Sequence, residues 1–290
     1  MALRTAIFID GANFRGNLRD FGFTSELSNG RVYRLEERHF NWDEFFSGVL
    51  DKFNAETGWE HQLIRVHWYS AASISPWPRK YEFSLSQKVV TGHSSIKGLT
   101  TDVVLEKARD WYAKERSYFE RLREDTFERI QREINFLEFR YVGQYKVLPL
   151  KASSIQERSG EIQYRGTRVG EKGVDLGIAV DMIAKMPYYD VAILVSGDAD
   201  FLPVVGYLKD HLKYVYQFSI AKGVPPSIRY LSPYLKGKVD CFESYNELEL
   251  LDKFLLREKG IPHDILVAID NRITQLSDGI YQPTMLVPDR

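Results

Sequence analysis

The stretch that decides the fold is "VAILVSGDADF" (Val191–Phe201). Five apolar residues run into a glycine-containing turn, and the turn carries Asp198 and Asp200 two positions apart. An apolar run that ends in turn-forming residues is typical of a buried strand. Two carboxylates so close together repel each other, and each costs free energy to remove from water. The stretch therefore predicts either a turn fully open to water or a positive group beside the two carboxylates.

A second apolar run near the N-terminus, Ala6–Ile9, also ends in an acidic residue, Asp10, followed by Gly11. A third acidic position, Asp175, lies at the start of the predicted helix that leads into strand 191–195. Ligand sites in open α/β sheets lie beyond the carboxyl ends of the strands. If the two strands are neighbours, we expect one cleft to collect the carboxylates of Asp10, Asp175, Asp198 and Asp200.

Strands alternate with helices along the chain, and this alternation predicts an α/β fold with a mostly parallel sheet of about five to six strands flanked by helices. We expect a domain over residues 1–245, in which 71–135 form an insertion with a long charged helix. The polar, glycine-rich residues 151–173 are expected to be mostly loop. Residues 246–290 are predicted to form a helical appendage that packs either on the domain or on a second copy, as a homodimer.

The overall composition limits the class of protein and of partner. The 290 residues carry a formal net charge of -1, so any nucleic-acid binding must use a local basic patch. A single cysteine, Cys241, excludes an internal disulfide framework and favours a reducing compartment, so the predicted location is the cytoplasm. No apolar run has the length of a membrane span, so no membrane partner is expected.

Four carboxylates in one cleft cannot all stay ionised unless a cation joins them, and hard oxygen ligands favour Mg²⁺ or Mn²⁺. Such a metal could activate a water molecule and stabilise charge on a phosphodiester. The alternative is structural, because an aspartate after a strand commonly forms a turn or caps a helix. Asn13 has the same two interpretations, as a cap or as a support for Asp10 or a metal-bound water.

Basic residues lie in two segments that could contact RNA. Lys172 and Arg168 precede Asp175, and Lys172 is the best single candidate because it adjoins that carboxylate. In the segment 71–100, Arg79 and Lys80 have Trp77 and Tyr81 nearby. Aromatic side chains stack on unpaired bases, and basic side chains hold phosphates. Both segments are equally consistent with ordinary solvated loops.

Three motifs together resemble the NYN-domain family of the PIN-like nuclease superfamily, which includes LabA-type bacterial proteins. They are "FIDGANF" (Phe8–Phe14), "KGVDLGIAVDMI" (Lys172–Ile183) and "YDVAILVSGDADFLPVV" (Tyr189–Val205). The resemblance implies a PIN-like fold and a metal-dependent endoribonuclease. It implies that Asp10, Asp175, Asp198 and Asp200 bind Mg²⁺ or Mn²⁺ with support from Asn13, and that Ser196 orients an aspartate or touches a phosphate.

Two other functions remain open at this point. The same fold could serve as a non-catalytic RNA-binding or regulatory scaffold, or as a nuclease directed at DNA. An aspartate-nucleophile phosphatase needs a second aspartate at position 12, where this chain has Ala12. A P-loop nucleotide hydrolase is excluded because the chain has no Gly-x-x-x-x-Gly-Lys-Ser/Thr loop.

Overall fold

The computed structural model describes residues 2–24, 31–227 and 232–279. Its backbone divides into two compact units, each of which draws on separate stretches of the chain. Unit 1 comprises residues 1–69, 130–140 and 175–290, and unit 2 comprises residues 70–129 and 141–174. None of the described helices is long and apolar enough to cross a membrane.

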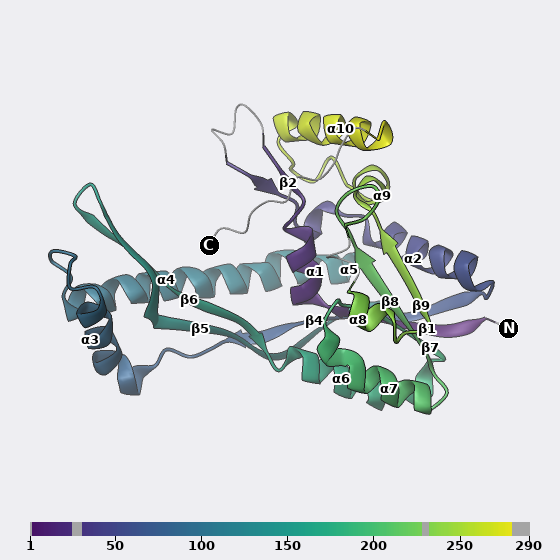
Figure 1. Cartoon of the computed structure of the whole chain (residues 1–290), viewed down its shortest axis with the longest axis horizontal. Helices are drawn as coiled ribbons and strands as arrows, with labels where there is room; N and C mark the ends of the chain where they lie inside the picture. The colour runs from purple at the N-terminus through teal and green to yellow at the C-terminus, as the bar shows by residue number, and fades with distance from the viewer. Residues whose placement is uncertain (1, 25–30, 228–231, 280–290) are drawn as a thin grey trace. The chain divides into compact units, whose positions relative to one another are not determined.

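Parallel strands build the sheet of unit 1 (Figure 1). The strand β1 pairs in parallel with β4 on one side and with β7 on the other, and β7, β8 and β9 continue in parallel. The bounds are β1 (Leu3–Asp10), β4 (His61–Ile74), β7 (Val191–Val195), β8 (Tyr214–Ile220) and β9 (Cys241–Tyr245). All of β7 is buried, as expected for a parallel strand that is covered on both faces.

Helices cover both faces of this sheet, with α1 and α2 on one face and α6 and α7 on the other (Figure 1). The bounds are α1 (Gly11–Leu18), α2 (Trp42–Thr57), α6 (Val174–Ala184), α7 (Leu202–Asp210), α8 (Pro233–Lys236), α9 (Glu247–Lys253) and α10 (His263–Ser277). The helix α2 begins where the Asn41 side chain accepts a hydrogen bond from the Glu44 N–H, and it ends at Gly58 in the left-handed conformation. A short pair, β2 (Gly22–Phe23) and β3 (Tyr33–Arg34), is antiparallel.

Aromatic side chains fill the space between α1, α2 and the sheet. The ring of Phe45 on α2 contacts Phe14 on α1 and Tyr245 on β9, with centroid distances of 6.1 and 5.0 Å. Trp42 meets Trp68 of β4 edge to face at 4.9 Å. Edge-to-face pairs add to the free energy of burial, so this cluster fixes α1 against the strand ends.

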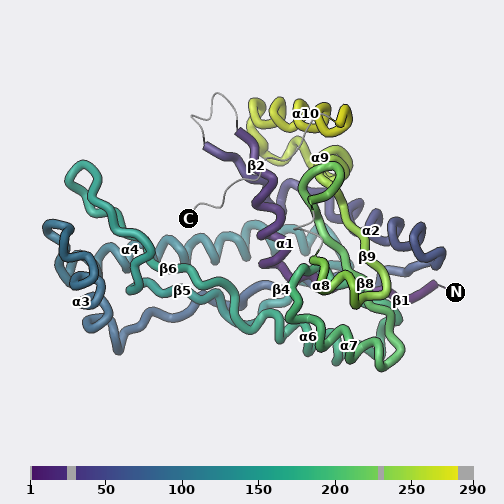
Figure 2. Tube along the Cα trace, in the orientation of Figure 1, coloured from purple at the N-terminus to yellow at the C-terminus, as the bar shows by residue number. Residues whose placement is uncertain are grey.

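Unit 2 contains a long antiparallel ribbon and a helical layer (Figure 2). The ribbon is formed by β5 (Leu137–Arg158) and β6 (Glu161–Lys172), and α4 lies against β6. The helical stretch consists of α3 (Glu82–Gly92), α4 (Thr101–Arg121), a π-helical segment (Leu122–Phe127) and α5 (Glu128–Glu133). The long charged helix expected within 71–135 is present, and it continues through a π-helical segment.

The expectation that residues 151–173 are mostly loop is wrong, because Tyr164 and its neighbours form β6. The polar composition of a loop is also that of a ribbon with one face in water. The other face packs on α4: Trp111 and Tyr164 are buried in the same cluster, and the Tyr164 hydroxyl donates a hydrogen bond of 2.7 Å to the Pro149 carbonyl. Ser159 and Gly160 supply the left-handed turn at the tip.

The predicted α/β class with a mostly parallel, helix-flanked sheet is confirmed. The hydrogen-bonded strand order is β6-β5-β4-β1-β7-β8-β9, and the ribbon accounts for the seventh strand, beyond the five to six expected. The division into a domain at 1–245 and an appendage at 246–290 stays a prediction.

Candidate functional site

The two acidic strand ends predicted from the sequence lie side by side. The strands β1 and β7 pair in parallel, and their register places Ile9 opposite Val195. Asp10, the last residue of β1, and Ser196, the residue after β7, therefore lie at the same edge of the sheet. This is the edge at which open α/β folds bind ligands.

Asp10 is buried, with 4% of its surface exposed, and caps the helix α1. Its Oδ1 accepts a hydrogen bond of 3.0 Å from the Asn13 N–H, and its Oδ2 accepts one of 3.0 Å from Ser196 Oγ. The capping role that an aspartate after a strand often has is thus real here. Hydrogen bonds to a carboxylate favour its charged form and fix its orientation.

Gly11 allows α1 to begin directly after β1 while its backbone lies close to β4. A Cβ atom at this position would lie 2.7 Å from Trp68 Nε1 and still closer to the carbonyl oxygen of Tyr69. A side chain would therefore push α1 away from β4 and move Asp10 with it.

Ser196 and Asn13 link the end of β1 to the turn after β7. Ser196 is buried, and its Oγ also accepts a hydrogen bond of 3.2 Å from the Asp198 N–H. The side-chain oxygen of Asn13 accepts one of 3.1 Å from the Gly197 N–H. Both residues therefore lie between the end of β1 and the acidic turn, and their roles toward a metal or a phosphate stay predictions.

The two aspartates of the turn differ in exposure. Asp198 is half-buried and Asp200 is exposed. Asp198 Oδ1 accepts a hydrogen bond of 3.0 Å from the Asp200 N–H and caps the 3-10 turn Ala199–Phe201. The Asp198 carboxylate therefore helps to form the turn, and both carboxylates can be reached from solvent.

Asp175 is exposed in the first turn of α6, where the positive end of the helix dipole favours a carboxylate. Among the residues that the structure describes, no three His, Cys, Asp or Glu side chains form a group that could hold a metal ion. The hydrogen-bonded network thus joins Asp10, Asn13, Ser196, Asp198 and Asp200, and the four-carboxylate cluster is not preformed.

The two basic residues predicted to bind substrate belong to unit 2. Lys172 is exposed at the end of β6. Arg168 is held by a bidentate ion pair in which its Nε and Nη2 lie 2.7 and 2.6 Å from the two carboxylate oxygens of Glu115. Since the Glu115 carboxylate is mostly buried, Arg168 has a structural partner that the sequence did not reveal.

Sequence reasoning missed two residues that hold the acidic turn. The Gln217 side chain donates a hydrogen bond of 2.9 Å to the Ser196 carbonyl, and Ser232 Oγ donates one of 2.5 Å to the Gly197 carbonyl. Gln217 could have been recognised from the sequence, because it is a polar residue in the mainly apolar β8, where it is fully buried. Ser232 had none, since it comes from a distant part of the chain.

Asp181, on α6, has a structural role. Its Oδ2 accepts a hydrogen bond of 2.8 Å from the Tyr69 hydroxyl and pairs with Lys185 at 2.9 Å. Although burial acts to raise the pKa of Asp181, the hydrogen bonds from Lys185 and Tyr69 hold it below its usual range. The hydrogen bond from Tyr69 ties α6 to β4.

Cys241 is a poor metal ligand in this fold. It is half-buried in β9, and burial, with a smaller contribution from the Glu243 carboxylate, raises the pKa of its thiol to about 11. A thiol binds metals as the thiolate, so this position does not favour zinc at neutral pH.

Comparison with known proteins finds a family model that includes the acidic turn. Residues 112–232 match the family model of the NYN domain. This part of the chain resembles an NYN domain. The match includes Asp175, Ser196, Asp198 and Asp200, together with Arg168 and Lys172, and it begins after Asp10 and Asn13.

The other comparisons add no argument about function. A solved structure of a protein of unknown function from Vibrio parahaemolyticus is 19% identical and covers 85% of this chain and 94% of its own, with a TM-score of 0.39. No curated protein matches this chain.

Proposed function

We propose that this protein is a metal-dependent endoribonuclease that acts in the cytoplasm. The observation that carries the proposal is the hydrogen-bonded chain from Asp10 through Ser196 to Asp198, at the carboxyl ends of two adjacent parallel strands. The match to the NYN domain supports a nuclease-type fold, and the carboxylates lie at the edge of the sheet where open α/β folds bind ligands.

The donor set fits Mg²⁺ or Mn²⁺ by its chemistry, because it consists of carboxylate and amide oxygens. Asp198 and Asp200 would hold the ion from the turn, Asp10 from the end of β1, and Asp175 from the start of α6. A bound divalent ion supplies positive charge that activates water and stabilises a phosphodiester in attack.

The chain's own residues prepare this site before any ligand arrives. Ser196 and the Asn13 N–H fix both oxygens of Asp10, so its orientation costs no reorganisation when a cation binds. Asp200 is exposed, so it can turn toward an ion without breaking a packed contact.

The test is cleavage of labelled RNA and DNA with Mg²⁺, Mn²⁺ or EDTA, using the wild type beside Asp198→Asn. A matched control is Asp210→Asn, because Asp210 is an exposed aspartate at the end of α7. We expect metal-dependent cleavage of RNA that is lost in Asp198→Asn and kept in Asp210→Asn. Equal cleavage by all three proteins would overturn the proposed site.

The same panel separates the two alternative functions. Cleavage of DNA in preference to RNA would identify a DNA-directed nuclease. Binding of RNA without cleavage under every metal condition would identify a non-catalytic scaffold. A homodimer through the C-terminal helices remains a proposal, and the molar mass in solution tests it.

A further inference from the structure

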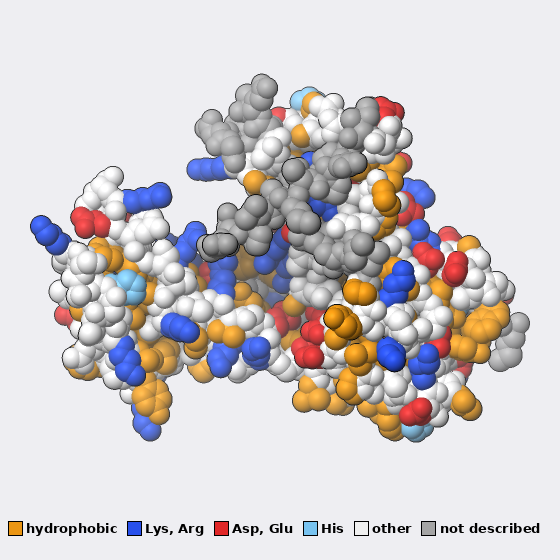
Figure 3. Space-filling model, in the orientation of Figure 1, with side chains coloured by type: hydrophobic (Ala, Val, Ile, Leu, Met, Phe, Trp, Pro, Cys, Tyr) orange, Lys and Arg blue, Asp and Glu red, His pale blue; other side chains and the backbone are white. Residues whose placement is uncertain are grey.

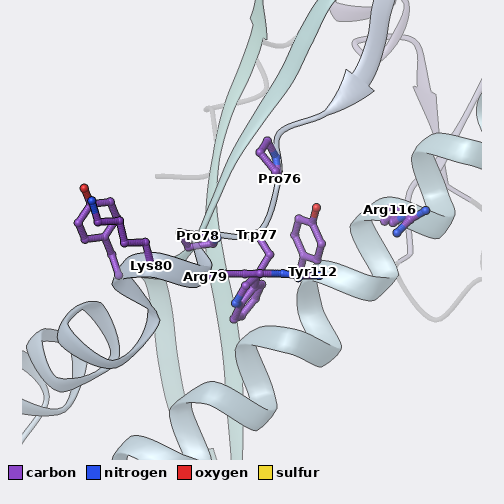
Figure 4. Close-up of a pocket in the computed structure, with 8 residues that line it drawn as sticks. Pro76, Trp77, Pro78, Arg79, Lys80, Tyr112 and Arg116 are labelled. Carbon is purple, nitrogen blue, oxygen red and sulfur yellow. The ribbon is translucent and has the colours of Figure 1, made fainter.

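A depression of about 650 Å³ lies on unit 2, where the segment after β4 meets α4 (Figure 4). We name it the Trp77 pocket. Its lining consists of Pro76, Trp77, Pro78, Arg79, Lys80, Tyr81, Tyr112 and Arg116. Three of these eight side chains are aromatic and three are cationic, and none is a carboxylate. Its volume falls within the range of small-ligand sites.

The aromatic walls are held in place before any ligand binds. Trp77 stands between two prolines, which restrict its backbone to an extended conformation. Its indole Nε1 donates a hydrogen bond of 2.8 Å to Glu82, and its ring meets Tyr112 at a centroid distance of 5.6 Å. The Tyr112 hydroxyl in turn donates one of 3.0 Å to the Ser75 carbonyl.

Glu82 accepts these bonds as a carboxylate. The hydrogen bond from Trp77, followed by that from Arg109, keeps the pKa of Glu82 below its usual range. Glu82 therefore positions the indole, while the lining of the pocket itself stays cationic.

The cations of the pocket are available for an anion. Arg79 has the smallest of the effects that act on the pKa of Glu82, and Lys80 lies over the ring of Tyr81 at 5.6 Å. Arg116 pairs only with Glu120, at an exposed position where such a pair is weak. In Figure 4 the side chains of Trp77, Arg79 and Tyr112 gather at one place, and Arg116 lies one turn along α4 from Tyr112.

The positive charge of the chain is concentrated in unit 2, which contains the Trp77 pocket. Unit 2 contains 17 Lys and Arg against 12 Asp and Glu, a net charge of +5, whereas unit 1 contains 22 against 28, a net charge of -6. Lys and Arg side chains are spread over the part of the surface formed by β5, β6 and α3 in Figure 3. The small overall charge thus hides a basic unit that attracts anions.

We propose that the Trp77 pocket binds an unpaired nucleotide of a single strand, with the base against the aromatic rings and its phosphate against Arg79. Lys80 and Arg116, which lie on opposite sides of Trp77 in Figure 4, then contact phosphates of neighbouring nucleotides. Flat rings recognise a base by its π face, and cations beside them recognise the phosphate. A base inside a duplex is stacked on both sides and cannot enter such a pocket, so the ligand is single-stranded. The inference rests on the proposed function, because it names the form of nucleic acid that this protein recognises.

The test measures binding alone, in EDTA, by the fluorescence anisotropy of a short labelled oligouridine. The charge variant is Arg79→Ala with Lys80→Ala, and its control is Lys88→Ala with Lys97→Ala, which removes two exposed cations outside the pocket. The stacking variant is Tyr81→Ala, and its control is Phe83→Ala. Tyr81 and Phe83 are exposed to 56% and 67%, so neither change disturbs a packed interior.

We expect each pocket variant to weaken binding about tenfold and each control to weaken it by less than about threefold. We also expect a duplex of the same length to bind more weakly than the single strand. Equal losses in pocket and control variants, or equal affinity for duplex and single strand, would overturn the inference. Competition by uridine monophosphate would show that a free nucleotide fills the pocket, and its absence would show that the strand is required.

Because the assay contains no metal, it separates this inference from the nuclease. Binding that needs the pocket, in a protein that does not cleave, supports the inference and rejects the enzyme. Cleavage that survives both pocket variants, with binding unchanged, supports the enzyme and rejects the inference.

Discussion

Ser196 Oγ lies 3.0 Å from Asp10 Oδ2 and donates a hydrogen bond to it. The bond joins two residues that are far apart in the sequence and that lie at the carboxyl ends of two adjacent parallel strands. The same Oγ accepts the N–H of Asp198, so one buried hydroxyl sets the orientation of Asp10 and the path of the acidic turn together.

Replacing Ser196 by alanine removes both bonds and leaves the Asp10 carboxylate with one donor fewer in a buried place. We expect Ser196→Ala to lower the free energy of unfolding by about 1–3 kcal/mol. We expect Ser277→Ala, which removes an exposed hydroxyl on α10, to change it by less than about 0.5 kcal/mol. Urea denaturation measures both values, and equal values would show that the Ser196 bonds are not important for stability.

Two glycines of α1 should respond to alanine in opposite directions. A Cβ on Gly11 would collide with Trp68 and Tyr69, so we expect Gly11→Ala to cost about 1–3 kcal/mol. A Cβ on Gly16 would meet no atom within 4 Å, and the helical position favours alanine, so we expect Gly16→Ala to add about 0.5–1 kcal/mol. Thermal unfolding of the two variants compares them directly, and a stable Gly11→Ala protein would contradict the close packing described above.

His39 should make the fold sensitive to mild acid. Its side chain is buried, and its Nδ1 accepts a hydrogen bond of 2.9 Å from the Glu36 N–H, which requires the neutral ring. Burial, with a smaller contribution from Arg38, lowers the pKa of His39 to about 4. Between about pH 6.5 and pH 4, His39 is therefore protonated in the unfolded chain and neutral in the folded chain. The free energy of unfolding falls as the pH drops through this range.

The His39→Gln variant tests this pH dependence. We expect a shallower loss of stability between pH 7 and pH 4.5 than in the wild type, by on the order of a few kcal/mol. The exposed His263 provides the control, and His263→Gln should keep the wild-type slope. His67, whose pKa burial also lowers to about 4, accounts for part of the slope that remains. Identical slopes in all three proteins would exclude His39 as a source.

Arg168 should matter more for folding than its exposed position suggests. Arg168→Ala removes the partner of a mostly buried Glu115 carboxylate, so we expect a loss of about 1–2 kcal/mol, reduced from that of a fully buried pair by the exposure of the guanidinium. Arg165→Ala, on the exposed face of the same strand, should have an effect close to zero. Chemical denaturation measures the free energy of unfolding of both variants. A loss of RNA binding in Arg168→Ala without any loss of stability would favour its predicted role as a substrate contact.

Metal binding should stabilise unit 1. At a concentration of Mn²⁺ about a hundred times its dissociation constant, a single site adds about 2.7 kcal/mol. We expect the melting temperature to rise with Mn²⁺ and to return with EDTA in the wild type, and to be unaffected in a protein with both Asp198→Asn and Asp200→Asn. A shift of the same size in that variant would place the metal elsewhere.

The sequence by itself determined the strands and the acids that follow them. Short apolar runs bounded by Asp and Gly are typical of buried parallel strands. The strands β1 and β7 and the acidic residues at their ends could therefore be predicted. Periodicity also showed α2, and the absence of Gly and Pro showed the long helix α4.

Only the tertiary structure decided which residues meet. Ser196, Asn13 and Gln217 join the site because the sheet places β1, β7 and β8 next to one another, and no local pattern encodes that adjacency. Residues 151–173 have the composition of a loop, and pairing with a neighbouring strand is what makes most of them a ribbon. Arg168 likewise pairs with Glu115, which is far away in the sequence, and Tyr112 on the long helix α4 contacts Trp77. Local preference indicates the buried apolar strands and the main helices, whereas the ribbon and the side-chain partners depend on long-range packing that a single sequence does not show.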